Sequence, residues 1–302
     1  MTSARRSCAI AIAAAALAVS AATAELHVPG RAAVRSLRAA ATAWPGAPFL
    51  PASLPRALAA ATTAPAVSNI TAVGSLNWDG YAVSRRGTRF SSIRATFYVP
   101  YLNCSKSPGK TLSSDWVGLD GFVGKPDSVE QGGVAANCSA AGKPSYFAWW
   151  EMFPQPEKRT SLSVRPGDSI TATISYSTAH KDFRITLADN TRGGHVAITR
   201  KCPDLKVGSR RVVCPRNSAE VIAEAPATGT SHHMVIAHLS DFGAVSFAAI
   251  AIADSSRHHA ALVSSHWSTT KIIQVRSPGG VVVAQPTSTQ AATFDSYWLR
   301  EH

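Results

Sequence analysis

A glutamine in the segment V-E-Q-G-G-V has the chemistry of an oxyanion ligand. Gln131 does not titrate, so it has no use as a general acid or base, but its side-chain amide donates two hydrogen bonds and accepts others. A donor of this kind stabilises the negative oxygen that develops when an acyl group is transferred. The alternative is a solvated residue at a strand edge, and the residue type alone favours that alternative. The choice depends on the residues that lie near Gln131.

Carboxylates on predicted strands form the second group of candidates. In A-E-V-I-A-E-A the period of two places Glu220 and Glu224 on one face of a strand. In F-A-W-W-E-M-F the same period places Glu151 on the face of Trp149. Acids are uncommon on strands. These carboxylates therefore indicate either a site or a solvated outer face.

A third segment, D-W-V-G-L-D, combines an aromatic side chain, a gap and a carboxylate. Strand alternation places Trp116, Gly118 and Asp120 on one face, and Val117 and Leu119 on the other. The first face is typical of the floor of a groove rather than of a core.

Short β-segments must position these side chains. Segments with strand composition, separated by Gly, Pro, Asn and Asp, are I-R-A-T-F-Y-V, S-D-W-V-G-L-D, S-Y-F-A-W-W-E-M-F, S-I-T-A-T-I-S-Y, F-R-I-T-L-A-D, A-E-V-I-A-E-A, F-G-A-V-S-F and K-I-I-Q-V. The segment R-P-G-D at 165–168 predicts a turn before the next strand. No amphipathic helical stretch longer than two turns stands out. The pattern predicts an all-β fold, an antiparallel β-sandwich of jelly-roll or concanavalin-like type.

At these residues the sequence resembles the glutamic peptidases, the eqolisin family. The family's signatures are N-W-x-G-Y, W-V-G-I-D-G, Q-x-G, Y-x-A-W-x-E, A-E-W-I-x-E and D-F-G-x-V-x-F, in that order. Here they read N-W-D-G-Y (77–81), W-V-G-L-D-G (116–121), Q-G-G (131–133), Y-F-A-W-W-E (146–151), A-E-V-I-A-E (219–224) and D-F-G-A-V-S-F (241–247). Six ordered blocks are far more specific than any one of them.

The resemblance implies a secreted, acid-active endopeptidase that uses a Gln/Glu pair, an activated water and neither a metal nor another cofactor. The family glutamine falls on Gln131 and the family glutamate on Glu220. A glutamate base must be ionised, so its pKa is expected below a mildly acidic working pH. Departures from the family pattern are Val221, where the family has a bulky aromatic residue, and Gly132, where it often has threonine.

The supporting residues follow from their faces and from the motif blocks. Trp116 is expected to wall the groove, and Asp120 and Glu151 to orient the catalytic pair. Glu224 lies about 13 Å from Glu220 along a regular strand, so only one of the two glutamates can meet Gln131. Residue spacing leaves that choice open, and the block alignment assigns Glu220.

Two other functions fit parts of the sequence. A Ser-His-Asp hydrolase would have ample Ser and His, but no G-x-S-x-G elbow is present. A lectin-like carbohydrate-binding module would use Trp116, Trp149 and Trp150 as sugar platforms. Such a module needs neither a buried Gln/Glu pair nor a cleavable leader.

The N-terminal region predicts export and processing. Residues 1–24 have two arginines, an apolar run and a closing A-T-A, the pattern of a secretory signal peptide. Residues 25–68 form a basic Ala/Pro-rich segment, either a propeptide or a linker, and residues 69–302 form the β-sandwich domain. The propeptide is a possible inhibitor whose arginines would dock on acids of the groove. Secretion to the exterior is expected, and no further membrane segment is predicted.

The charge of the mature region argues against nucleic acid as a partner. Residues 1–68 contain six of the 30 Lys and Arg and one of the 18 Asp and Glu, which leaves 24 basic against 17 acidic residues, a net charge of +7. These basic residues are scattered rather than gathered in a stripe. Polypeptide substrates and a monomeric protein are expected.

Four cysteines follow the predicted signal peptide. An even number in an oxidising compartment favours disulfides, and the absence of a C-x-x-C pair argues against structural zinc. Adjacent histidines at 232–233 and 258–259 are predicted at the surface. Four cysteines allow three connectivities. We choose Cys104–Cys138 and Cys202–Cys214, which close two local loops.

Overall fold

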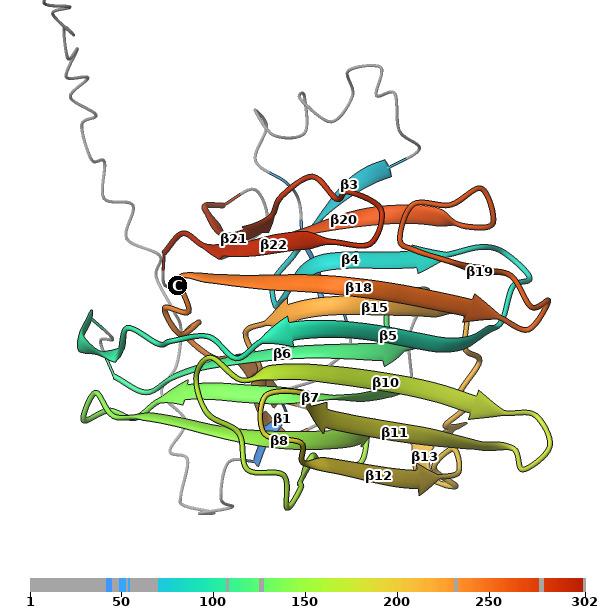
Figure 1. The fold of residues 1–302 in the computed structure, drawn as a ribbon, viewed down its shortest axis with the longest axis horizontal. Coiled ribbons are helices and arrows are strands. Elements are labelled where there is room, and N and C mark those ends of the chain that lie inside the picture. The colour runs from blue at the N-terminus through green and yellow to red at the C-terminus, as the bar shows by residue number, and fades with distance from the viewer. Residues whose placement is uncertain are drawn as a thin grey trace, which may run out of the picture. The chain divides into compact units, whose positions relative to one another are not determined.

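Strands make up nearly all of the regular structure. The computed structural model describes residues 42–44, 49–52, 54, 70–106, 109–124, 128–230, 233–276 and 280–300. Within these ranges the one helical element is the short 3-10 turn η1 (Cys104–Lys106). No helix in the described ranges is both long and apolar enough to cross a membrane. The predicted all-β sandwich is confirmed, and its strands are drawn in Figure 1.

The first layer carries the candidate residues. In spatial order its strands are β2 (Pro51–Ala52), β3 (Ile70–Ser75), β20 (Ser268–Val275), β4 (Trp78–Ser84), β15 (Ser218–Glu224), β6 (Thr111–Leu119), β7 (Val129–Cys138), β8 (Pro144–Phe153) and β9 (Lys158–Arg159). All neighbours are antiparallel except β3 and β20, which are parallel.

The second layer covers one face of the first. In spatial order its strands are β21 (Val282–Pro286), β22 (Phe294–Trp298), β18 (Ala244–Asp254), β5 (Phe90–Tyr98), β10 (Ser169–Ser177), β11 (Asp182–Asp189) and β12 (His195–Arg200), with β19 (His259–Ala260) beside β18. In Figure 1 strands of the two layers are superimposed and run in similar directions. Strands β20 and β21 also pair, which joins the layers at one edge.

The main hydrophobic core lies between the layers. Val117 and Val221 of the first layer belong to one buried cluster with Ile185 and Phe247 of the second. The layers approach closely at Gly132, where a Cβ would come within 2.8 Å of the Ile185 side chain. A second buried cluster lies on the opposite face of the first layer and is built around three tryptophans, Trp78, Trp116 and Trp149.

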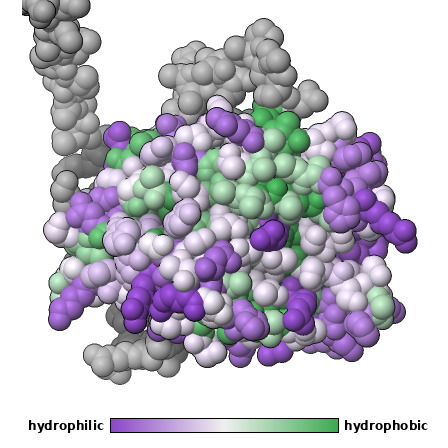
Figure 2. All heavy atoms as spheres, viewed as in Figure 1, coloured by the Kyte–Doolittle hydropathy of each residue, from purple (hydrophilic) through white to green (hydrophobic). Residues whose placement is uncertain are grey.

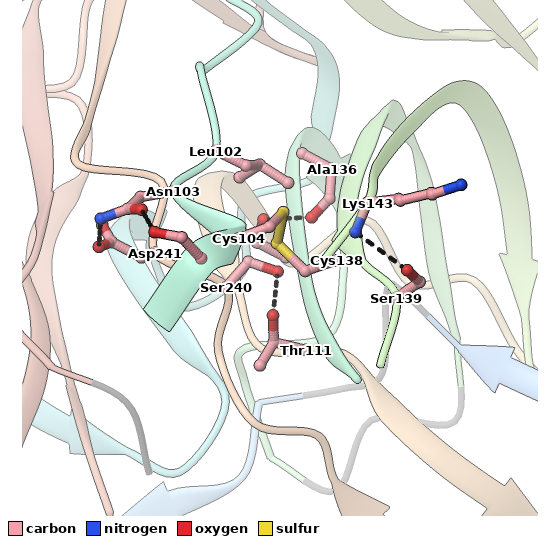
Figure 3. The surroundings of a disulfide bond; sticks show 12 residues. Leu102, Asn103, Cys104, Thr111, Ala136, Cys138, Ser139, Lys143, Ser240 and Asp241 are labelled. Atoms are coloured by element: carbon pink, nitrogen blue, oxygen red, sulfur yellow. Dashed lines mark hydrogen bonds between the residues drawn. A yellow bond between two sulfur atoms is a disulfide. The ribbon is translucent and has the colours of Figure 1, made fainter. Parts of the chain in front are cut away.

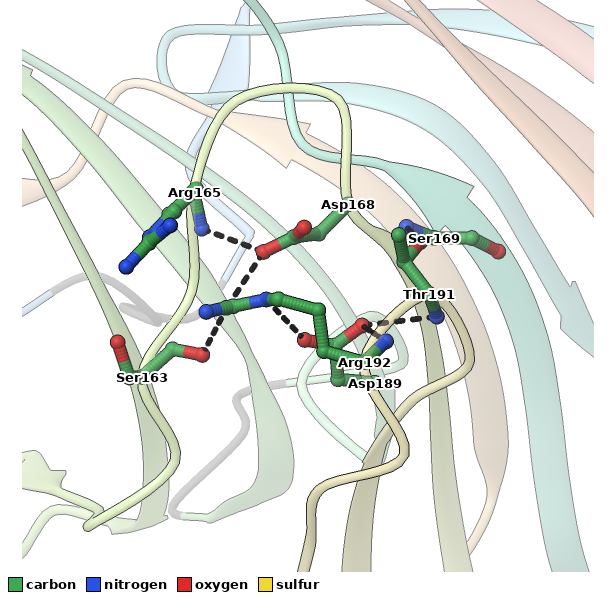
Figure 4. A network of polar contacts seen from close by, with 7 residues as sticks. All are labelled: Ser163, Arg165, Asp168, Ser169, Asp189, Thr191 and Arg192. Carbon is green, nitrogen blue, oxygen red and sulfur yellow. Dashed lines mark hydrogen bonds and ion pairs between the residues drawn. The ribbon is translucent and has the colours of Figure 1, made fainter.

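The predicted turn at 165–168 is present and contacts the turn between β11 and β12. The backbone N–H groups of Arg165 and Asp168 bond back across the turn, at 2.6 Å to the Asp168 carboxylate and 3.1 Å to the Arg165 carbonyl. Arg192 bonds both Asp168 (2.7 Å) and Asp189 (3.0 Å), as Figure 4 shows. Because Arg192 follows β11, this pair of contacts fixes the β11–β12 turn against the start of β10.

Both predicted disulfides are confirmed. Cys104–Cys138 joins η1 to the last residue of β7, and Cys202–Cys214 closes a shorter loop before β15. Figure 3 shows the first bridge beside the hydrogen bond between Thr111 and Ser240. The first bridge therefore fixes the strand that carries Gln131, at the end away from the glutamine.

Short strands lie outside the two layers. Strands β1 (Thr42–Trp44), β16 (Ala227–Thr230) and β17 (His233–Ile236) form a small sheet, and β13 (Lys206–Val207) pairs with β14 (Arg210–Arg211). An open pocket of about 460 Å³ is lined by Arg94, Thr173 and His259 from the second layer and its edge. Figure 2 shows hydrophobic residues gathered in the upper middle of the visible face, with hydrophilic residues concentrated at its right side and lower left.

Candidate active site

The strand register brings Gln131 and Glu220 to either side of one glycine. Gly118 on β6 is directly opposite Glu220 on β15, and on its other side it is directly opposite Gln131 on β7. Two strand spacings separate the Cα atoms of Gln131 and Glu220, roughly 10 Å. Both side chains lie on the same face of the sheet as the missing side chain of Gly118. The space above Gly118 is where an amide and a carboxylate can act on one bond.

Gly118 is required by its surroundings. A Cβ at this position would lie 2.9 Å from the Trp116 ring and 3.3 Å from the Gln131 Cβ. Any side chain would therefore press on two of the candidate residues and fill the gap between Gln131 and Glu220.

Gln131 and Glu220 are both fully buried, with 0 % of each residue exposed. The solvated-edge interpretation of Gln131 and the solvated-face interpretation of Glu220 and Glu224 are therefore wrong. Burial of an amide and a carboxylate carries a free-energy cost unless hydrogen bonds or an opposite charge compensate for the lost hydration. It also means that a substrate can reach these residues only after part of the chain is displaced.

Glu151 orients the Gln131 amide. These two residues are directly opposite on β8 and β7, and Gln131 Nε2 donates a hydrogen bond of 2.7 Å to Glu151 Oε2. Because Glu151 Oε2 accepts this bond, the nitrogen of the amide is the end that faces Glu151. Burial raises the pKa of Glu151 well above its usual range, and Glu157 raises it further.

Glu224 is engaged in a different network. Trp116 Nε1 donates to its Oε2 at 2.8 Å, and Asn77 Nδ2 donates to its Oε1 at 3.1 Å. Register places Glu224 opposite Trp78 and Ser114 rather than beside Gly118. Sequence reasoning missed the role of Asn77, although this asparagine is the first residue of the N-W-D-G-Y block.

The tryptophans expected at an open surface are buried. Trp116 and Trp149 are 0 % exposed and Trp150 is 6 % exposed. Trp78 packs edge-on against Trp116 with ring centroids 5.1 Å apart, and Trp149 Nε1 donates to Ser114 Oγ at 3.0 Å. Trp78, Trp116 and Trp149 pack beside the candidate residues on the same face, whereas Trp150 lies in the core between the layers, so in this structure none of them is available as a sugar platform.

Asp120 does not continue the alternation of β6, which is a correction to the sequence analysis. Strand β6 ends at Leu119, and Asp120 has a φ of 69°. Its carboxylate accepts hydrogen bonds of 2.8 Å from the backbone N–H groups of Arg216 and Asn217. Asp120 therefore anchors Arg216 and Asn217, the two residues that directly precede β15.

Glu130 is a buried acid that the sequence analysis missed. It precedes Gln131 and points to the interlayer side of the sheet, because neighbouring strand residues face opposite ways. Burial and the nearby Asp120 carboxylate raise the pKa of Glu130 well above its usual range. Burial likewise raises the pKa of Asp120 to about 6, offset in part by its hydrogen bonds.

Burial also raises the pKa of Glu220 well above its usual range, and the Asp120 carboxylate adds to this effect while the Ser218 hydroxyl opposes it. Neither carboxylate oxygen is within hydrogen-bond distance of a partner in the described part of the chain. The expectation of a low pKa does not hold in this closed arrangement, because burial of the carboxylate outweighs the opposing effect of the nearby Ser218 hydroxyl.

The two departures from the family pattern lie away from the candidate residues. Val221 is fully buried in the main core, and Gly132 faces the second layer, where a Cβ would meet Ile185. Both alternate with the catalytic candidates along their strands. They adapt the packing between the layers rather than the face that carries Gln131 and Glu220.

Residues of the predicted leader contact this face. The Phe49 backbone N–H donates to the Gly121 carbonyl at 3.2 Å. The Phe49 ring lies 5.8 Å from the Trp78 ring and 5.1 Å from the Phe122 ring. The next residue, Leu50, donates its N–H to Asn77 Oδ1 at 3.0 Å.

Two leader strands extend these contacts. Strand β2 pairs with β3, and β1 pairs with β16 close after Glu224. The leader therefore adds one strand beside β3 and one strand to the small sheet of β16 and β17. Its arginines, predicted to dock on acids of the groove, lie outside the described residues.

No three His, Cys, Asp or Glu side chains of the described ranges gather as a metal-binding group. The arrangement that the structure does show is an amide and a carboxylate across a glycine, with a second carboxylate behind the amide. Such a set can bind a water, remove its proton and hold a negative oxygen.

Comparison with known proteins supports a single family. The model of the Peptidase A4 family matches residues 76–295. A solved structure of scytalido-glutamic peptidase with a transition-state analogue inhibitor has 22 % identity and a TM-score of 0.59, covering 74 % of this chain and 98 % of that one. SCP-B, described as a member of the eqolisin family in complex with the tripeptide Ala-Ile-His, has 22 % identity, a TM-score of 0.55 and the same coverage. The curated proteins contain no significant sequence match.

Proposed function

The chain belongs to the Peptidase A4 family, the glutamic peptidases, and from this premise we propose that Gln131 and Glu220 are its catalytic pair. Membership of this family makes the protein a peptide hydrolase with polypeptide substrates. The observation that supports the pair is the register of β15, β6 and β7, which aligns Glu220, Gly118 and Gln131 in one row. Glu224 lies on the same face of β15, four residues beyond Glu220, and both of its carboxyl oxygens accept hydrogen bonds, from Trp116 and Asn77.

Hydrolysis proceeds by attack of water on the peptide carbonyl. Ionised Glu220 takes a proton from the water as its oxygen bonds to the carbonyl carbon, and the carbonyl oxygen becomes negative. The Gln131 amide donates a hydrogen bond to that oxygen. Glu220 then gives the proton to the leaving nitrogen as the C–N bond breaks, which yields a carboxylic acid and an amine. One oxyanion donor lowers the activation free energy by roughly 3–4 kcal/mol.

Activity in acid is part of the proposal. In the closed arrangement the raised pKa of Glu220 keeps its carboxyl protonated, so it cannot act as a base. When the site opens, water solvates the carboxylate and removes the main cause of the shift. The ionised fraction of Glu220 then becomes large in a mildly acidic medium.

The leader is proposed to inhibit the enzyme until it is removed. Support comes from its contacts with Gly121, Asn77 and Trp78, and from the complete burial of the catalytic pair in the full chain. Leader peptide added to processed enzyme should slow casein cleavage at pH 5–6. An unchanged rate of casein cleavage at a saturating concentration of leader peptide would show that the leader is not an inhibitor.

Export and processing complete the proposal. Residues 1–24 direct secretion, and the mature protein begins between Thr62 and Ser75. Sequencing the N-terminus of protein collected from culture medium tests both statements. A mature start inside the N-W-D-G-Y block, or protein retained in cells with residues 1–24 intact, would contradict them.

A casein assay at pH 3–5 tests the function itself. The secreted protein should clear casein at these pH values, and the rate should be indifferent to chelators and to serine-directed reagents. Loss of activity with a chelator, restored by added metal, would overturn the mechanism. Clearance abolished by a serine-directed reagent would do the same.

A further inference from the structure

We infer that Trp78 and Phe122 form an aromatic subsite, which selects polypeptide substrates with an aromatic side chain at one fixed distance from the cleaved bond. In the full chain Phe49 of the leader occupies this subsite. The inference rests on the proposed function, because it treats the leader as bound along the path of a substrate.

The ring contacts define the subsite. Phe49 meets Phe122 edge-on, with ring centroids 5.1 Å apart and an interplanar angle of 64°, and meets Trp78 at 5.8 Å and 58°. Tilted and edge-on pairs at these distances are the favourable arrangements of aromatic rings. Phe49 and Phe122 are both partly buried against the tryptophan cluster, whereas Trp78 is fully buried.

Backbone contacts hold the leader without regard to its side chains. Around Phe49 and Leu50 the N–H groups bond to Gly121 O (3.2 Å) and Asn77 Oδ1 (3.0 Å), and Leu50 O accepts from Leu76 N–H at 2.9 Å. Main-chain bonds of this kind are available to any extended peptide. Discrimination therefore depends on the side chain at the position of Phe49.

The subsite is continuous with the catalytic row. Trp78 packs against Trp116, and the Trp116 ring borders the gap above Gly118. Gly121 lies one residue beyond Asp120, and a Cβ on this glycine would come 3.0 Å from the Trp78 ring. A peptide in the leader's path thus passes along the face that carries Gln131 and Glu220.

Peptide binding to the full chain tests the subsite without requiring turnover. The probe is a fluorescein-labelled A-P-F-L-P-A-S-L peptide, which copies residues 47–54, and its matched control replaces the phenylalanine with alanine. Phe49→Ala in the full chain weakens the leader's own hold. We expect this variant to bind the phenylalanine peptide about tenfold or more tightly than the unchanged chain does, and to bind the alanine peptide weakly.

Variants of the pocket give the second arm. In the Phe49→Ala background, Phe122→Ala should abolish the preference for the phenylalanine peptide. Val123→Ala, a neighbour that is 37 % exposed, should leave the preference unchanged. Phe122→Leu serves if thermal unfolding shows that Phe122→Ala is not folded.

The outcomes separate this inference from the catalytic proposal. Equal binding of the two peptides, binding of neither, or a preference that survives loss of Phe122 would each overturn the subsite. Cleavage sites mapped in casein should also carry Phe, Tyr or Trp at one constant position. If the catalytic proposal fails and the protein does not cleave casein, the preference for the phenylalanine peptide in the binding assay can still be present.

Discussion

At the scale of single residues, Glu151 should act through Gln131 rather than on the substrate. Replacing it by glutamine puts an N–H donor beside the acceptor oxygen, so the Gln131 amide is no longer held in one orientation. We predict that Glu151→Gln lowers kcat by about a hundredfold, the loss expected from a misplaced catalytic group, with little change in KM. Steady-state kinetics on a casein-derived peptide measures both constants.

A structural role for Glu151 alone would give another pattern. Its loss would then lower the unfolding temperature and leave the kcat of the folded fraction unchanged. The exposed Asp204, which pairs only with the exposed Arg211 among the described residues, provides a control. Asp204→Asn should alter neither constant.

Alternation along strands identified several residue positions from the sequence. It placed Glu220 and Glu224 on one face, and Glu151 on the face of Trp149, as the structure shows. It failed at Asp120, because a positive φ ends the alternation at that residue. It also gave no sign of the bond from Asn77 to Glu224, which joins residues 147 positions apart.

At the scale of elements, strand β6 positions the pair by having no side chain at Gly118. We predict that Gly118→Ala abolishes casein cleavage, because the added Cβ would lie 2.9 Å from the Trp116 ring and 3.3 Å from the Gln131 Cβ. Gly194→Ala is a matched control, since its Cβ also comes within 2.9 Å of one side chain, Leu162, but near the second layer. Activity and thermal unfolding of both variants check the prediction.

A Gly118→Ala enzyme with unchanged activity would mean that the gap above this glycine is not where the reaction occurs. Loss of activity in both variants to the same degree would indicate a general packing defect instead.

The segments with alternating or β-branched residues were predicted as strands and are strands in the structure. Strand β7 was not predicted, because V-E-Q-G-G-V-A-A-N-C has two glycines, three polar side chains (Glu, Gln and Asn) and no alternation. Burial on both faces of that strand explains the pattern. The parallel pairing of β3 with β20 joins residues about 200 positions apart, and local sequence holds no information on it.

At the scale of the whole molecule, buried carboxyls should make the fold more stable in acid. Burial raises the pKa of Asp79, Asp115, Glu130, Glu151, Glu220 and Glu224. The folded state therefore binds protons more tightly than the unfolded state, so this stability is present below the unfolded pKa of about 4 and is lost as pH rises. Burial raises the pKa of Asp120 from 3.8 to about 6. This shift corresponds to about 3 kcal/mol of unfolding free energy that is lost as pH rises through that range. Urea unfolding of the full chain should give a lower free energy of unfolding at pH 7 than at pH 3.5.

Asp115 offers a direct check of this origin. Both of its carboxylate oxygens are buried without a hydrogen-bond partner among the described residues. Asp115→Asn removes one proton-binding group from the folded state, so the fall in unfolding free energy between pH 3.5 and pH 7 should become smaller. Asp204→Asn should leave that fall unchanged, and equal effects of the two substitutions would count against burial as the cause.

The central claim is that Glu220, and not Glu224, is the general base opposite Gln131. The most direct measurement is the rate of casein cleavage at pH 4 by Glu220→Gln and Glu224→Gln, each shown to be folded by its thermal unfolding. The register of β15, β6 and β7 predicts that Glu220→Gln falls to background, because it keeps the shape of the side chain and loses the proton acceptor. Glu224→Gln should retain substantial turnover. A folded Glu220→Gln enzyme that cleaves casein at nearly the rate of the unchanged protein would contradict the account.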